Sequence, residues 1–134
     1  MTIELGAELQ ALLAGQAYGH VVTINRDGSP QVSMVWMDVR DGVASFNTAI
    51  GRRKERNLRR DPRIIVSVED PDRPQQYALL RGTATLTEEG AVEQIHRLAG
   101  KYLDHDRYTL QPGERRVTVT IAVERVTGRG PWVA

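Results

Sequence analysis

The residues best suited to chemistry in this sequence are the cations of the segment "FNTAIGRRKERNLRRDPR", residues 46–63. Between Arg52 and Arg63 there are seven basic and two acidic side chains, a local net charge of +5, whereas the whole chain carries only +1. Non-specific affinity for nucleic acid comes from many neutralised phosphates, so a nearly neutral chain is a poor general polyanion binder. The local excess therefore predicts a small anionic partner.

The order of residues in this segment is typical of a phosphate site. Thr48 ends a predicted strand, Gly51 forms a turn, and Arg52, Arg53 and Lys54 follow in the first turn of a predicted helix. The helix dipole disfavours cations at its N-terminus, so these three cost stability unless an anion compensates them. The placement favours an anion site over the alternative, a solvated helix face. It is not a P-loop, because G-x-x-x-x-G-K-[ST] is absent.

Other catalytic groups are scarce. The chain has no cysteine, which excludes disulfides, thiol nucleophiles and cysteine-ligated metals. His20, His96 and His105 lack the spacing of metal ligands, and no G-x-S-x-G motif supplies a serine nucleophile. We therefore expect no metal site, and if the protein is an enzyme, we expect a cofactor to carry the chemistry.

The length and the apolar pattern set the expected organisation. A chain of 134 residues predicts one domain over residues 1–134. No apolar run approaches the length of a membrane span, and the N-terminus lacks the basic start and the cleavage site of a signal peptide. We expect a cytoplasmic protein that does not enter membranes.

Hydrophobic periodicity predicts about six strands and three short helices. The helices are expected at residues 3–14, after Gly51 up to Asp61-Pro62, and at 88–103; three strands are expected within residues 18–48, and others at 63–70, 75–87 and 115–128. Asp27-Gly28 and Asp41-Gly42 are hairpin signals, which predict antiparallel pairing. Gly82 suggests a bulge, and Thr87 is the expected N-cap of the third helix. This order is typical of a small antiparallel barrel whose openings are covered by helices.

The aromatic residues lie on or beside the predicted strands. Phe46 is expected in the core, whereas Trp132 follows the last strand. An aromatic residue in a C-terminal tail can cover a pocket or cross to a partner subunit.

Three segments, "VVTINRDGSPQVSMVW", "FNTAIGRRKERNLRRDPRIIVSV" and "YALLRGTATL", resemble the pyridoxamine 5′-phosphate oxidase-like split β-barrel flavoproteins. Within that superfamily the sequence is most similar to the branch of small oxidoreductases that use the deazaflavin coenzyme F420. The resemblance covers residues 5–128. It implies a homodimer of six-stranded split barrels with two cofactors at the subunit interface.

The resemblance also implies which residues bind the cofactor. Arg52, Arg53 and Lys54 match the basic motif that holds the cofactor phosphate, with Asn47 and Thr48 beside it. The strand that lines the flavin or deazaflavin ring matches Gln31, Val32, Ser33 and Met34. Tyr77 matches a further cofactor-binding residue near the site, and the tail with Trp132 would border the substrate side. The chain lacks the C-terminal arginine- and histidine-containing segment of the vitamin B6 oxidases, which argues against that activity.

The function expected from these observations is hydride transfer from reduced F420, or from FMN as the second choice, to a small electrophilic or unsaturated substrate. Arg56, Arg59 and Arg60 either contact the acidic oligoglutamate tail of F420 or are solvated. The alternative function is a non-enzymatic flavin or deazaflavin carrier or sensor. A small barrel that binds nucleic acid is less favoured, because the aromatic residues do not interleave with the arginines.

Overall fold

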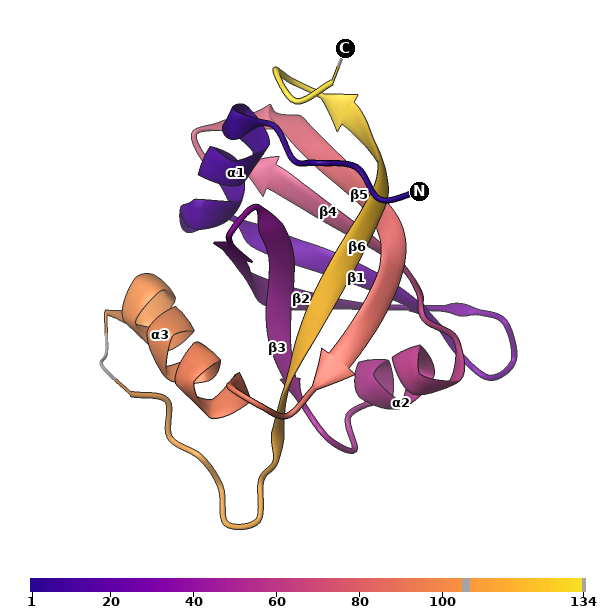
Figure 1. Ribbon diagram of the computed structural model, residues 1–134, viewed down its shortest axis with the longest axis vertical. Helices are drawn as coiled ribbons and strands as arrows, with labels where there is room; N and C mark the ends of the chain where they lie inside the picture. Colours follow the sequence, from indigo (N-terminus) through magenta and orange to yellow (C-terminus); the bar gives the residue numbers. More distant parts are fainter. Residues whose placement is uncertain (105–106, 134) are drawn as a thin grey trace.

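The computed structural model describes residues 1–104 and 107–133, and its centre is an antiparallel β-barrel with three helices around it (Figure 1). The strands are β1 (Tyr18–Ile24), β2 (Pro30–Arg40), β3 (Val43–Ala49), β4 (Arg63–Asp70), β5 (Arg73–Thr87) and β6 (Arg116–Arg129). The helices are α1 (Ala7–Ala14), α2 (Arg53–Arg60) and α3 (Ala91–Leu103). The barrel closes in the order β1-β2-β3-β6-β5-β4, and every neighbouring pair is antiparallel. The predicted fold class, a mainly β protein built on a six-stranded antiparallel barrel, is confirmed.

The hairpin between β2 and β3 follows from the chemistry of its turn. Arg40 pairs with Val43, and the two residues between them, Asp41 and Gly42, have φ angles of 52° and 76°. Two successive left-handed residues give the turn whose twist matches that of the flanking strands, and Asp-Gly is a favoured sequence for it. This turn fixes the register of the two strands whose outer faces carry the candidate site.

The bend in β5 depends on Gly82. The β5–β6 register shifts between Arg81 and Gly82, so the predicted bulge is confirmed. A Cβ atom at Gly82 would lie 2.1 Å from the carbonyl oxygen of Ala122. Only glycine allows the two backbones to approach so closely.

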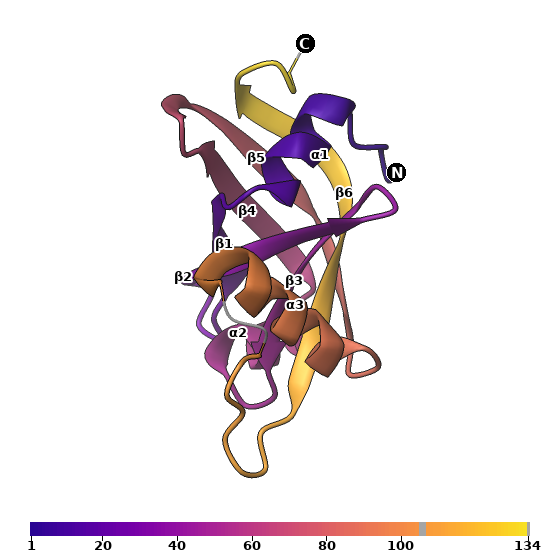
Figure 2. The same cartoon turned by 90° about the vertical axis from the view of Figure 1, so that its left-hand side faces the viewer.

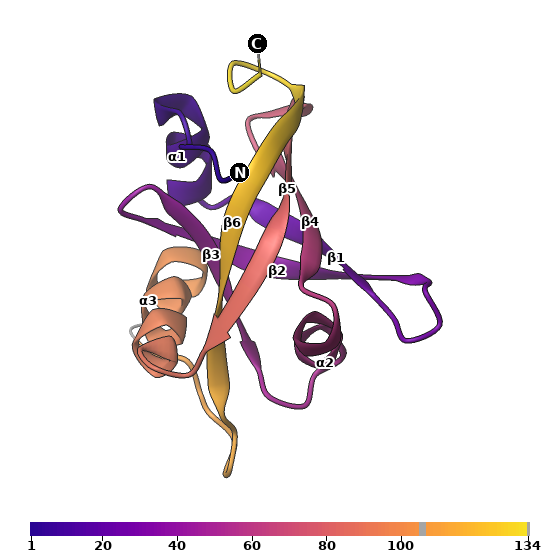
Figure 3. The same cartoon turned by 45° about the vertical axis from the view of Figure 1, so that its right-hand side comes forward.

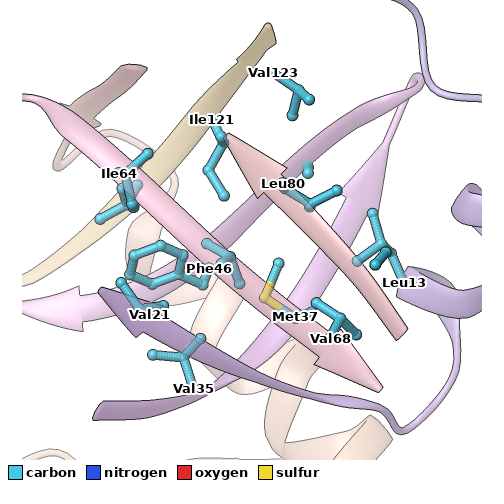
Figure 4. Packing of buried hydrophobic residues seen from close by; sticks show 14 of the residues in the cluster. Leu13, Val21, Val35, Met37, Phe46, Ile64, Val68, Leu80, Ile121 and Val123 are labelled. Atoms are coloured by element: carbon cyan, nitrogen blue, oxygen red, sulfur yellow. The ribbon is translucent and has the colours of Figure 1, made fainter. Parts of the chain in front are cut away.

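The core fills the barrel and is closed by a helix at each end. Phe46, Met37, Val21 and Leu80 are fully buried and pack inside the barrel (Figure 4). α1 contributes Leu13 at the end where β6 finishes, and α2 covers the opposite end, with its side chain of Leu58 buried (Figure 1). The expected core position of Phe46 is confirmed.

Two helix starts differ from the predictions. α1 begins at Ala7 rather than residue 3, because the preceding segment runs beside β6 and the Ile3 N–H donates to the Val123 carbonyl at 2.8 Å. α3 begins after Gly90, whose φ is 77°, and Thr87 is the last residue of β5 instead of an N-cap. The ladder with β6 extends to Thr87 and competes successfully with helix capping.

Two further expectations from the sequence concern membrane spans and metal ligands. No helix among the described residues is long and apolar enough to cross a membrane. His105, one of the three histidines considered as metal ligands, lies outside the described residues.

Candidate functional site

A cavity of about 150 Å³ lies where α3, the first turn of α2 and the outer faces of β2 and β3 meet. Figure 2 shows α3 in front of these strands, with α2 lower and farther from the viewer. The residues that line the cavity are Met34, Val35, Trp36, Asn47, Arg52, Lys54, Ile95, Leu98, Tyr108 and Arg116. Three of these ten side chains are cations, and no carboxylate of the described residues is among them.

Lys54 is the most unusual of the three cations. Its side chain is buried, with 8% of its surface exposed, and it makes no hydrogen bond or ion pair with any residue in the described part of the chain. Burial lowers the pKa of Lys54, and the charges of Arg52 and Arg116 lower it further. A largely buried lysine that lines a cavity without a counterion among the described residues is costly, so its retention points to an anion that binds there.

Arg116 is held rigidly at the back of the cavity. It is 4% exposed, and its Nη1 contacts Glu114 Oε2 at 2.6 Å while its Nε donates to Asn47 Oδ1 at 2.8 Å. Its guanidinium lies 5.0 Å from the centre of the Tyr108 ring, a cation–π contact. Glu114 balances one of the three positive charges, so the cavity keeps a net positive charge.

At the start of α2, the carboxylate of Glu55 binds to the helix itself and does not enter the cavity. Gly51 has a φ of 96°, and its N–H donates to Glu55 Oε1 at 2.8 Å. Glu55 also forms an ion pair with Arg59. This arrangement satisfies an N–H group at the helix start without placing a carboxylate in the cavity.

Gln94 of α3 organises the wall behind Asn47. Its amide nitrogen donates to Asp38 Oδ2 at 3.1 Å and to Ser45 Oγ at 3.0 Å. Its carbonyl oxygen accepts from Asn47 Nδ2 at 2.9 Å and from Thr118 Oγ1 at 2.8 Å. The four hydrogen bonds satisfy the whole amide of a buried side chain, and they fix Asn47 in the orientation that receives Arg116.

An aromatic stack forms the other wall. Trp36 lies parallel to Tyr102, with ring centres 5.4 Å apart, and meets the edge of Tyr108 at 6.3 Å. The Tyr102 hydroxyl accepts the Met37 N–H at 2.9 Å and donates to the Ala17 carbonyl. Burial is the main cause that raises the pKa of Tyr102 to about 12. The stack gives the cavity a rigid apolar side beside its cationic one.

The structure brings four of the predicted cofactor-binding residues into this cavity: Met34, Asn47, Arg52 and Lys54. Arg53 points to the other side of α2, where its Nη1 lies 3.4 Å from Asn25 Oδ1. Thr48 faces the barrel interior, fully buried, and its hydroxyl has no hydrogen-bond partner among the described residues.

The remaining predicted site residues lie outside the cavity. On β2, Gln31 accepts a hydrogen bond from Thr23 Oγ1 at 3.0 Å, Ser33 has a buried hydroxyl, and Val32 is 58% exposed. Tyr77 and Trp132 meet near the C-terminus, where Trp132 Nε1–H donates to the Tyr77 carbonyl at 2.8 Å. Within one chain, these two residues are not brought to the cavity.

Six lining residues were not identified from the sequence, namely Val35, Trp36, Ile95, Leu98, Tyr108 and Arg116. Val117 and Val119 of β6 point into the barrel. Because successive side chains of a strand point to opposite faces, Arg116 lies on the outer face of β6. It is buried only because α3 covers that face. No local signal in the sequence identifies such a residue.

Comparisons with known proteins agree with this architecture. The family model described as pyridoxamine 5′-phosphate oxidase matches residues 5–130. Among solved structures, an F420 reductase shares 29% identity at a TM-score of 0.77, with 88% of this chain and 94% of that chain covered. The conserved hypothetical protein Rv2991 from Mycobacterium tuberculosis also shares 29% identity, at a TM-score of 0.72 and with 93% and 84% covered. Group A Streptococcus HupZ has the same fold at 21% identity, a TM-score of 0.66 and 91% of both chains covered.

Proposed function

Because the chain belongs to the pyridoxamine 5′-phosphate oxidase family, we propose that it is an oxidoreductase that binds a phosphate-bearing redox cofactor. The cofactor is coenzyme F420, with FMN as the alternative. The cavity lined by Arg52, Lys54 and Arg116 would hold the phosphate. Similarity to an F420 reductase at 29% identity supports the choice of F420.

The observation that carries this proposal is the uncompensated charge of the cavity. Lys54 is largely buried without a partner among the described residues; this burial depresses its pKa, and the charges of Arg52 and Arg116 depress it further. A phosphate accepts hydrogen bonds from several cations at once and relieves their mutual repulsion. The residues present therefore fit a phosphate group.

The size of the cavity suggests where the rest of the cofactor lies. Sites for small molecules commonly enclose about 300–1,000 Å³, whereas this cavity encloses about 150 Å³. It has room for the phosphate end of a cofactor, and the ring would lie over the outer face of β2. Val32 and Met34 on that face are 58% and 56% exposed.

We propose that a second copy of the chain covers this face. Tyr18, Ile65 and Tyr77 extend the exposed apolar surface onto β1, β4 and β5, and β1 pairs with both β2 and β4. Exposed apolar residues that gather on one face are typical of an interaction site. A homodimer would bury it and complete the two cofactor sites.

When bound, reduced F420 supplies a hydride for a small electrophilic or unsaturated substrate. The chain would contribute binding and orientation. The cations would hold the phosphate, Gln94 and Asn47 would fix Arg116, and Trp36 would border the space that the ring occupies. The protein would act through position and electrostatics.

Titration of the cofactor-free protein tests this proposal. F420, FMN and riboflavin are added separately, and binding is followed by fluorescence. We expect saturable F420 binding, and much weaker binding of riboflavin than of FMN because riboflavin lacks the phosphate. Equal affinity for FMN and riboflavin would contradict the phosphate site. Loss of reduced-F420 absorbance in a screen of unsaturated substrates separates an enzyme from a carrier.

A further inference from the structure

A second hollow lies on the opposite side of α2 from the Lys54 cavity. It encloses about 290 Å³ between α2 and the β1–β2 turn. Figure 3 shows the β1–β2 hairpin projecting on the same side of the barrel as α2. The lining residues, which we call the arginine hollow, are Asn25, Arg26, Arg53, Arg56, Asn57 and Arg60.

The four arginines of this hollow have no carboxylate partner within the described residues. The two acids of the basic segment are used elsewhere, since Glu55 pairs with Arg59 and Asp61 pairs with Arg63. The carboxylate of Asp27 accepts hydrogen bonds from the hydroxyl and the backbone N–H of Ser29, which lower its pKa, and the charge of Arg53 lowers it further. Glu55 and Asp61 also lie near Arg56 and Arg60 and offset part of their charge. The hollow keeps an excess of positive charge.

The floor of the hollow is fixed by hydrogen bonds. Asn57 is 2% exposed, and its amide nitrogen donates to Asn25 Oδ1 and to Thr23 Oγ1, both at 3.0 Å. Its oxygen accepts from Arg60 Nη2 at 3.1 Å, and Arg60 also donates to the Ile24 carbonyl. These contacts hold Arg60 at the floor and leave most donors of Arg26, Arg53 and Arg56 available.

We propose that the arginine hollow is a second anion-binding site, which takes a ligand with two or more neighbouring carboxylate or phosphate groups. Planar guanidinium groups bind such groups through paired hydrogen bonds, which a cluster of lysines does not do. Four cations exceed what a single carboxylate neutralises. Among the described residues, no aromatic side chain lines the hollow, so these residues offer no stacking surface for a nucleic-acid base.

The site is defined by its own residues, so binding of a free polyanion does not depend on what occupies the Lys54 cavity, whereas binding of a cofactor tail rests on the proposed function. The anionic groups can come from two sources. One is the oligoglutamate tail of a cofactor bound nearby, and the other is a free polyanion.

Isothermal titration calorimetry with inorganic tripolyphosphate and with a tri-γ-glutamate peptide tests the site. We expect saturable binding of a probe to the wild-type protein, and a loss of at least about tenfold in the double variant Arg53→Gln/Arg56→Gln. The control Arg40→Gln/Arg63→Gln removes the same charge from exposed positions outside the hollow, and we expect its affinity to change less than about twofold.

A comparison of F420 carrying a long tail with F420 carrying a single glutamate identifies the source. If the hollow variant weakens only the long-tailed form, the ligand is the cofactor tail; if it weakens neither form but still loses the free probes, the ligand is a free polyanion. Absence of probe binding to the wild-type protein would overturn the proposal. An equal loss of probe affinity in the control variant would also overturn it. The same holds if a single-stranded oligonucleotide binds more tightly than the probes and both variants weaken its binding alike. FMN, which has no tail, reports on the Lys54 cavity independently.

Discussion

Replacing Lys54 with methionine measures two effects of this lysine separately. One is its effect on the stability of the folded protein, and the other is its contribution to ligand affinity. Methionine has a similar length and no charge, so it fills the same space without the cost of a buried ammonium. Replacement of buried charges by apolar side chains is often stabilising by about 1–4 kcal/mol. Lys54 lines a cavity rather than dry core, so we expect the lower end, a gain of about 1 kcal/mol in the free energy of unfolding.

The same variant should lose affinity for F420. A hydrogen bond to a charged group contributes about 1.5–3 kcal/mol, which corresponds to about a ten- to hundredfold rise in Kd. Urea denaturation and fluorescence titration measure the two effects. Arg63→Met is the matched control, because it removes one positive charge from the same basic segment at an exposed position whose partner is Asp61. We expect it to change stability by less than about 0.5 kcal/mol.

The pH dependence of stability gives a further check on Lys54. Its pKa is lowered from 10.5, mainly by burial, so just below pH 10.5 the unfolded chain holds a proton that the folded protein has released. Stability of the wild-type protein should therefore rise with pH through that window, and the advantage of Lys54→Met should shrink. A variant that is less stable than wild type and binds F420 with unchanged affinity would refute the reasoning.

Three other substitutions test the packing around the site. Gly82→Ala should lower the free energy of unfolding by about 3 kcal/mol, because its Cβ would meet the Ala122 carbonyl oxygen at 2.1 Å. Gly6→Ala, whose added Cβ would make only an ordinary contact, 3.8 Å from Glu8 Oε2, is the control in the same urea denaturation. Tyr102→Phe should remove the tyrosinate absorbance step near pH 12. In the wild-type protein the stability from this raised pKa is complete below about pH 10 and is lost as pH rises to about 12; the variant should lack that decline. Gln94→Leu should lower the free energy of unfolding by about 3 kcal/mol, because it leaves the buried hydrogen-bond partners of Gln94 unsatisfied. It should also weaken F420 binding by displacing Asn47. Unchanged stability would contradict the role of Gln94.

Much of the barrel could be predicted because its signals are local. The strand at residues 63–70 matches β4 at both ends, and the Asp41-Gly42 turn forms as its sequence indicates. Gly82 marks a bulge because glycine in a strand interior has few other uses. The prediction for Thr87 is wrong because a threonine before two glutamates suits a helix N-cap as well as the end of a strand. The long-range ladder with β6 makes Thr87 the end of β5.

The site could be predicted only in part, because its residues meet through packing. Arg53 and Lys54 are neighbours in one basic run, yet they face opposite sides of α2, and this depends on where the helix docks. Arg116 and Tyr108 join the cavity from a segment far along the chain. Their contribution depends on α3 covering β3 and β6, which no local pattern encodes.

A crystal structure of the protein with F420 bound would show where the cofactor phosphate lies. We expect the phosphate within hydrogen-bonding distance of Lys54 Nζ and in contact with Arg52 or Arg116, beside the aromatic wall of Trp36. A phosphate bound elsewhere, with the Lys54 ammonium still without an anion, would contradict this expectation.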